Sequence, residues 1–185
     1  MPIPEPFPPS PKRYKDLHLN GISGAEALEE CSATSVSLEN FCHYDPALNK
    51  KEGVFGQAGS SQTELSNRGV SNGDLFLFFG FYKNFAIKKI ELHHLFGWLQ
   101  IEKIIKGDEE IRSYLVQNNI EHPHGYGELN TYKNNTIYIG KKNLEISGVE
   151  KKEKGYGLFK KTHPDLVLTR NEKSKGSWKL PRRYF

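Results

Sequence analysis

The densest apolar pattern of the chain lies between residues 73 and 101. Two runs, Leu75 to Tyr82 and Leu92 to Ile105, are rich in aromatic and β-branched residues and are separated by polar positions, a pattern typical of two paired strands. Apolar side chains occupy both alternating sets of positions in the first run, so we expect that strand to be buried on both faces and central in its sheet. Gly80 and Gly97 interrupt the runs and indicate bulges, corners or the close approach of another backbone or a ligand.

Helical patterns flank this central pair. Ser23 to Cys31 begins with a capping Ser and has Glu three residues later, and Asp108 to Asn118 begins with three acidic residues before apolar positions at helical spacing. Further short strands are expected at Thr136 to Ile139 and Leu144 to Ile146. By contrast, Asn40 to Asp74 is rich in Gly, Ser and Asn with few periodic apolar residues, which predicts a long ordered loop.

Composition sets the size and the class of the protein. The 185 residues are 36% hydrophobic and 12% aromatic, enough for a single domain over 1–185 with a sizeable core. Residues 1–22 are expected to form an extended, Pro-rich segment packed on that domain. No apolar run approaches the roughly 20 residues that span a bilayer, and the first residues lack the pattern of a signal peptide. We therefore expect a cytoplasmic protein with no membrane partner.

The net charge of +4 is distributed unevenly. From residue 141 to 185 there are 13 Lys and Arg against 5 Asp and Glu, a net charge of +8, whereas the preceding part carries 13 against 17, a net charge of −4. A basic end of this kind is either an ordinary Lys-rich surface or a contact region for nucleic-acid phosphates. The candidate phosphate-binding residues are Lys160, Lys161, Arg170, Lys173 and Lys175.

Histidines supply the candidate chemistry. His43 and Asp45 fit an acid–base pair, although the same spacing also fits an Asx-type turn. His94, in the second strand run, is the third catalytic candidate. His122 and His124 flank a Pro and could bind a metal, but no Cys or carboxylate cluster stands at a recognisable spacing, so both are predicted to be structural loop residues and no metal is predicted.

The chain lacks the sequence motifs of several common enzyme classes. The chain has no nucleophile elbow, P-loop, dinucleotide fingerprint or zinc-protease helix, and it indicates no particular cofactor. Tyr82 and Trp98 are amphipathic aromatics that could stack on a planar base, although core or rim packing is the preferred explanation for each of them taken singly.

The order of motifs resembles known families. The stretch that begins Gly73-Asp-Leu-Phe-Leu-Phe-Phe-Gly and continues with His94-Leu-Phe-Gly-Trp resembles the opening of a PUA-like domain of the EVE or ASCH kind. The whole chain, from about Pro4 to Tyr184, is similar to the third nucleotide-modification-associated domain family of phage and bacteria, whose members are described as DNA base hypermodification proteins. The motifs that carry this similarity include His43-Tyr-Asp-Pro, Phe55-Gly-Gln, His122-Pro-His, Asn135-Thr-Ile-Tyr and Ser177-Trp-Lys-Leu-Pro.

The resemblance implies a fold and a function. The fold would be α+β, a PUA-like small mixed β-barrel with one or two flanking helices. Its function would be to bind a modified or flipped base of DNA in a pocket beside the central strands. The candidate base-binding residues are Phe55, Gln57, Asp74, Tyr82, Trp98 and Asn130.

Two other functions stay open. The chain could be an enzyme of DNA base or nucleotide hypermodification that uses the His43 and Asp45 pair. It could also be a non-catalytic interaction subunit of a phage or defence assembly, with the apolar end from Trp178 to Phe185 as its docking strip. The base, the strand state of the DNA and any cofactor are left open by the sequence.

Overall fold

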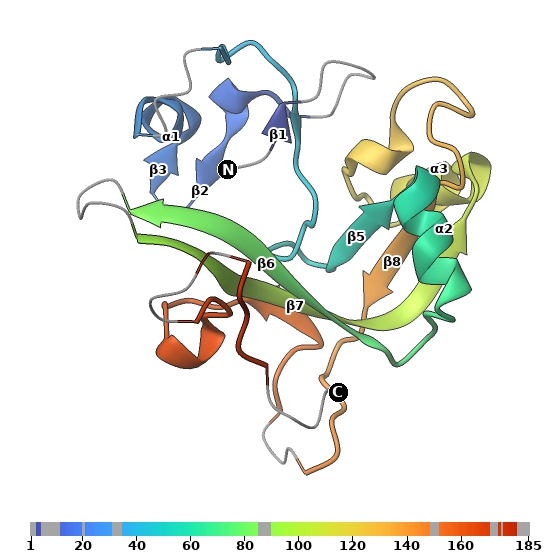
Figure 1. Cartoon of the computed structure of the whole chain (residues 1–185). Coiled ribbons are helices and arrows are strands. Elements are labelled where there is room, and N and C mark those ends of the chain that lie inside the picture. Colours follow the sequence, from blue (N-terminus) through green and yellow to red (C-terminus); the bar gives the residue numbers. More distant parts are fainter. Residues whose placement is uncertain are drawn as a thin grey trace.

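The computed structural model of the chain is shown in Figure 1. The residues it describes are 3–4, 12–19, 21–30, 35–84, 90–148, 152–170, 174 and 176–180. Within them, the three α-helices are α1 (Gly24–Glu30), α2 (Gly59–Asn67) and α3 (Asp108–Gln117). Short 3-10 segments are η1 (Tyr14–Asp16), η2 (Pro123–Gly125) and η3 (Pro164–Leu166). The strands are β1 (Ile3–Pro4), β2 (His18–Leu19), β3 (Ile22–Ser23), β4 (Cys42–His43), β5 (Val54–Gln57), β6 (Leu75–Asn84), β7 (Ile90–Lys106), β8 (Thr136–Gly140) and β9 (Tyr156–Leu158).

The main sheet is antiparallel and has five strands. Its order is β5-β8-β7-β6, and β9 also pairs with β7. The 17-residue β7 organises the sheet, because its first half pairs with β6 and β9 and its second half with β8. The two runs predicted from the sequence are therefore confirmed as a strand pair. In Figure 1 this β6–β7 hairpin crosses the middle of the molecule, with the N-terminal elements on one side and the C-terminal segments on the other.

The predicted barrel is wrong, because the sheet does not close. Among the described residues, β5 and β6 stand at the two ends of the strand order and share no ladder. They meet instead through aromatic side chains: the ring of Phe55 lies 5.1 Å from that of Phe76 and 5.0 Å from that of Phe78, both edge to face. The fold is thus mixed α+β with a curled, open sheet.

The expectation that the first run is a central strand buried on both faces is also wrong. Phe76 and Phe78 face the interior, but the alternate set is exposed, with Leu77 and Phe79 at 49% and 46%. The apolar character of both faces predicted burial, but β6 lies at the end of the strand order. The register shift between Phe78 and Phe79 agrees with the predicted irregularity near Gly97. A Cβ on Gly97 would lie 2.8 Å from the carbonyl oxygen of Gly157, so β9 comes close there.

Two interior clusters hold this sheet. In one, α3 packs Ile111 and Leu115 against strand residues such as Val54 and Ile137. In the other, Leu99, Ile101 and Tyr138 form the centre of the sheet. The N-terminal elements have a separate small core of Tyr14, Leu17, Leu28 and Cys42.

The remaining predicted elements have mixed outcomes. Helices α1 and α3 and strand β8 confirm the predictions at those positions. The stretch from Asn40 to Asp74 is not a single loop, because it contains β4, β5 and α2. Helix α2 was not predicted, because it has one large apolar residue and so no apolar stripe. Its sequence is Gly-Ser-Ser-Gln-Thr-Glu-Leu-Ser-Asn. The strand predicted at Leu144 to Ile146 is absent there.

Two further observations concern the Pro-rich start of the chain and membrane-spanning helices. Of the Pro-rich start, Ile3 and Pro4 pair with His43 and Cys42 as β1, and the other residues before Lys12 lie outside the described part. Searching the described residues for a helix long and apolar enough to cross a bilayer finds none.

Candidate functional site

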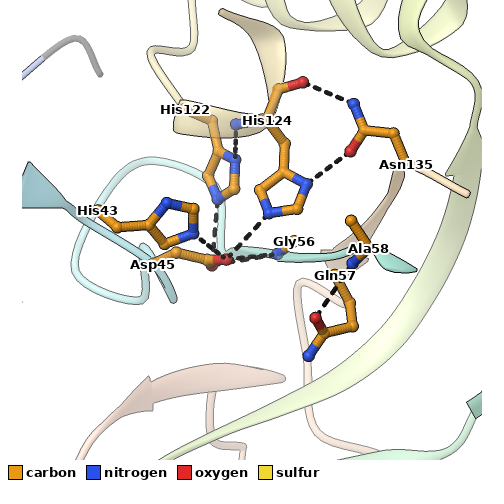
Figure 2. Close-up of polar contacts among 8 residues, drawn as sticks. All are labelled: His43, Asp45, Gly56, Gln57, Ala58, His122, His124 and Asn135. Carbon is orange, nitrogen blue, oxygen red and sulfur yellow. Dashed lines mark hydrogen bonds and ion pairs between the residues drawn. The ribbon is translucent and has the colours of Figure 1, made fainter. Parts of the chain in front are cut away.

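A buried cluster of polar side chains lies where β4, β5 and η2 meet (Figure 2). We call the side chains of His43, Asp45, His122 and His124 the His–Asp cluster. β4 carries His43, Asp45 follows it, and η2 with its cap carries the two remaining histidines. Their side chains are 19%, 4%, 0% and 4% exposed, respectively. Asp45 and His122 are 77 residues apart in the sequence, so only the folded chain assembles this cluster.

The carboxylate of Asp45 is the centre of the cluster. Its Oδ1 lies 3.2 Å from Nε2 of His122, and its Oδ2 lies 3.5 Å from Nε2 of His43 and 3.7 Å from Nε2 of His124. The backbone N–H of Gly56 donates to both oxygens at 3.1 Å. A carboxylate buried without partners would cost several kcal/mol, and the hydrogen bonds from Gly56 and His122 offset that cost.

Asn135 fixes the tautomer of His124. The amide nitrogen of Asn135 donates to Oδ1 of Asp108 at 2.6 Å and to the carbonyl oxygen of His124 at 2.9 Å, and both of these are acceptors only. The amide oxygen of Asn135 must then be the atom 2.6 Å from Nδ1 of His124, and it can only accept. Nδ1 of His124 therefore carries a proton, and Nε2 of the neutral ring has a free lone pair.

His122 has the opposite tautomer. Its Nδ1 accepts the backbone N–H of His124 at 3.4 Å, which closes η2 at its start, and Pro123 supplies a φ suited to the first helical position. The neutral ring then carries its proton on Nε2, which donates to Oδ1 of Asp45. His122 thus anchors one carboxylate oxygen.

Gly56 allows the cluster to be this compact. A Cβ at this position would lie 2.3 Å from Cδ2 of His124, inside the imidazole ring's contact distance. Only glycine lets β5 lie against that ring while its N–H reaches Asp45. On the other side, the ring of Tyr132 stacks on His124 at a centroid distance of 4.8 Å.

Burial and neighbouring groups set the charges of the cluster. Burial disfavours the charged carboxylate, but the neighbouring rings of His122, His43 and His124 outweigh it and hold the pKa of Asp45 well below its ordinary value of 3.8. Burial lowers the pKa of His124 from 6.5 to about 4, and the opposing attraction of Asp45 does not restore it. At neutral pH, Asp45 is therefore an anion and His124 a neutral ring.

The cluster could hold a metal ion. One ligand atom each from His43, Asp45 and His124 lies within 4.8 Å of the others. The sequence predicted no metal because no carboxylate follows His122 and His124 at a recognisable spacing. The missing carboxylate is Asp45, which the fold supplies from β4's loop.

A pocket lies next to two residues that contact the cluster, although no member of the cluster lines it. It has a volume of about 420 Å³, and Asn135 and Tyr132, which contact His124, form part of its wall. The remaining wall is polar and includes the base-binding candidate Asn130 together with Gln62, Thr63, Asp108 and Asn134.

A second pocket lies on the opposite side of β5. Alternation along the strand directs Phe55 and Gln57 away from the face of Gly56, and Figure 2 shows the Gln57 side chain pointing away from the cluster. Phe55 and Gln57 line a pocket of about 490 Å³ together with Phe76 and Phe78. The structure therefore places two of the base-binding candidates in one pocket, but not beside the catalytic candidates.

The other base-binding and catalytic candidates lie elsewhere. Tyr82 contacts His94 edge to face at 5.9 Å, and Nε2 of buried His94 has no hydrogen-bond partner among the described residues. Trp98 donates from its indole to the carbonyl oxygen of Lys154, and Asp74 accepts the N–H of Ser71. None of these contacts joins the residues to the His–Asp cluster.

The phosphate-binding candidates lie at the surface or outside the described residues. Lys160, Lys161 and Arg170 are exposed, and Lys173 and Lys175 lie outside the described residues. Their role as phosphate contacts stays a prediction.

The fold and the cluster together define the class of protein: a small mixed α+β protein with a buried histidine–carboxylate centre. The model of one family, described as nucleotide modification associated domain 3, matches residues 1–185, so the chain belongs to that family. No curated protein and no solved structure matches the chain. Its family therefore associates it with nucleotide modification.

Proposed function

We propose that the chain is an enzyme acting on a nucleotide or nucleobase, with the His–Asp cluster as its reacting centre. The observation that carries this proposal is the convergence of three imidazoles on one buried carboxylate. Apolar side chains would fill the same space at a lower cost in desolvation, so stability alone does not account for such a group. Perturbed titratable residues gathered in this way are a common mark of a reacting centre.

The members of the cluster suit different roles. His43 is the most exposed of them and, while its Nε2 holds no metal ion, it is suited to exchange a proton with a substrate. Asp45, held as an anion 3.5 Å from Nε2 of His43, would orient that ring and stabilise its protonated form. His122 and Gly56 keep the carboxylate in place by donating to it.

The polar pocket beside His124 suits a nucleotide substrate. Amide side chains such as Asn130 and Asn134 can pair with the donor and acceptor edges of a base. Asn135 in the same wall bonds to His124, so a ligand there would be in contact with the hydrogen-bond network of the cluster. This supports a nucleotide or an exposed base as the object of the reaction.

The proposal can be tested by mass spectrometry. Purified protein is incubated with nucleotides and with DNA containing unmodified or modified bases, and the nucleosides are analysed after digestion. We expect a change of mass with the wild type and with His163→Ala, and a rate at least 100-fold lower with His43→Ala. His163 is a matched control because it pairs with Asp165 at the surface. Equal rates for both variants, or no product from any substrate, would contradict the proposal.

Base binding without catalysis is the second candidate. Phe55, Phe76 and Phe78 provide aromatic surfaces and Gln57 an amide in a single pocket, a combination that suits a stacked and edge-bonded base. Binding of labelled single-stranded DNA would then weaken at least tenfold in Gln57→Ala. Leu77→Ala, on the opposite face of β6, would leave it unchanged, and equal losses in both would refute this candidate.

The third function, a docking role for the C-terminal strip, has less support. Trp178 packs on Phe79 at 4.8 Å and donates to Nδ1 of His93 at 2.9 Å, so this part of the strip lies against the sheet. Residues 181–185 lie outside the described part of the chain.

A further inference from the structure

We propose that His43, Asp45 and His124 bind one divalent first-row transition ion, of the zinc or ferrous class, through the two Nε2 atoms and Oδ2. This inference goes beyond the proposed enzyme function, because it stands on the positions of the ligand atoms. It would hold for a protein that binds an ion without performing catalysis.

Two hydrogen-bond acceptors face each other in the cluster. The hydrogen bond from Nδ1 of His124 to Asn135 leaves the Nε2 lone pair of the neutral ring directed at the cluster. That atom lies 3.7 Å from Oδ2 of Asp45, which is also an acceptor. Two acceptors at this distance repel each other, and a cation between them turns the repulsion into two bonds.

The two carboxylate oxygens of Asp45 have different partners. Nε2–H of His122 donates to Oδ1, so that oxygen is engaged and the carboxylate is held in a fixed orientation. Oδ2 is the oxygen that faces both His43 and His124. His122 is therefore a positioning residue, while the other three supply ligand atoms.

The spacing of the three ligand atoms is close to that of a coordination site. With metal–ligand bonds of about 2.0–2.2 Å, two ligands on a tetrahedral ion lie about 3.4 Å apart. The distances from Oδ2 to the two Nε2 atoms are 3.5 and 3.7 Å, and the whole set lies within 4.8 Å. A small movement of side chains would complete three coordination bonds and leave further positions for water or a substrate atom.

The chemistry of the ligands selects the class of ion. Two imidazoles and one carboxylate favour zinc, iron, cobalt or manganese, whereas magnesium and calcium prefer ligand sets made of oxygen. A metal-bound histidine commonly donates from its other nitrogen to a fixed acceptor, which orients the ring and raises its basicity. Asn135, itself held by Asp108, is that acceptor for His124.

The test uses the purified full chain, stripped with a chelator and dialysed against excess Zn²⁺ or Fe²⁺ under anaerobic conditions. Bound metal is counted by mass spectrometry, and Co²⁺ is titrated in parallel as a spectroscopic probe. We expect one ion per chain and the ligand-field absorption of a four- or five-coordinate Co²⁺. The zinc and iron arms identify which ion binds more tightly.

Two variants make the outcome specific. His43→Ala removes the most exposed ligand, and we expect at least a 100-fold loss of affinity, with His43→Gln as a second variant if the first fails to fold. His163→Ala removes a surface His of the same His-x-Asp spacing and should bind as the wild type does. A wild type that binds no ion and gives no Co²⁺ band, or a folded His43 variant with undiminished binding, would overturn the proposal. Metal binding without activity on nucleotides would contradict only the enzyme function, and activity undiminished in chelator would show that catalysis does not use the ion.

Discussion

The chain contains two pairs with the same spacing, His43-Tyr44-Asp45 and His163-Pro164-Asp165. Both bring a ring nitrogen close to a carboxylate oxygen, at 3.5 Å in the first pair and 3.4 Å in the second. The side chains of the second pair are 64% and 88% exposed, whereas those of the first are 19% and 4% exposed. The two pairs thus have similar local contacts, but the first pair is largely buried and the second is exposed.

The difference shows what turns a common motif into a site. A His and an Asp two residues apart readily meet in a turn, and at the surface water screens their attraction. Around Asp45, η2 adds two more imidazoles and β5 adds the N–H of Gly56. These partners come from distant parts of the chain, so the buried pair depends on the tertiary structure and the exposed one does not.

Replacing the two aspartates should separate the pairs most clearly. Asp45→Asn removes the negative charge and places an amide NH2 group against the N–H of Gly56 or of His122. We expect a loss of about 3 kcal/mol in the free energy of unfolding. Asp165→Asn should change it by less than about 0.5 kcal/mol. Urea denaturation of metal-free protein measures both, and similar losses in the two variants would remove the distinction.

Acid should destabilise the metal-free protein through the cluster. Folding lowers the pKa of His124 from 6.5 to about 4. Between these two pH values the unfolded chain therefore binds more protons than the folded protein. Stability should be constant above pH 6.5 and fall by about 3 kcal/mol as the pH is lowered towards 4. The lowered pKa of Asp45 adds a further loss below its ordinary value of 3.8. Unfolding curves recorded between pH 7.5 and 4 that show constant stability would contradict this account.

A single methyl group should disturb the cluster through Gly56. Gly56→Ala places Cβ 2.3 Å from Cδ2 of His124, so we expect a loss of about 2 kcal/mol as the ring or the strand shifts. Gly176→Ala is the control, because a Cβ at Gly176 has no atom within 4 Å. Thermal unfolding compares the two. Equal melting temperatures would mean that β5 does not lie against His124.

The smallest expected effect on stability belongs to His43. His43→Ala removes one partly exposed ring from Asp45, and we expect a cost of about 1 kcal/mol, with less for His163→Ala. Metal binding and activity should nevertheless be lost only in His43→Ala. Denaturation and binding measured on the same samples would separate a functional role of His43 from a structural one.

Much of the sheet could be predicted from the sequence, because period and residue type determine local structure. The runs that became β6 and β7, and the acidic start of α3, are strong patterns of this kind. Helix α2 could not be predicted, since its polar sequence forms a helix only through its tertiary position. The exposed face of β6 and the failure of the barrel to close depend on which strands find partners, which hydrophobicity alone does not encode.

The site was predictable in part. His43 and Asp45 were candidates from their spacing, but His122 and His124 were predicted to be structural because their carboxylate lies 77 residues away from His122. The sequence assigned no role to Asn135 in the motif Asn-Thr-Ile-Tyr, and its role appears only from its bonds to Asp108 and His124. A His-x-His pair combined with a distant His-x-Asp pair is the signal that could have indicated the cluster.

The most direct test of the central claim is the location of a bound ion. Crystals grown with Zn²⁺ or Co²⁺ would be measured on both sides of the metal absorption edge. We predict one anomalous peak about 2.1 Å from Nε2 of His43, Nε2 of His124 and Oδ2 of Asp45. An ordered cluster with no peak in it, or with the ion bound at the exposed His163 and Asp165 pair instead, would contradict the account.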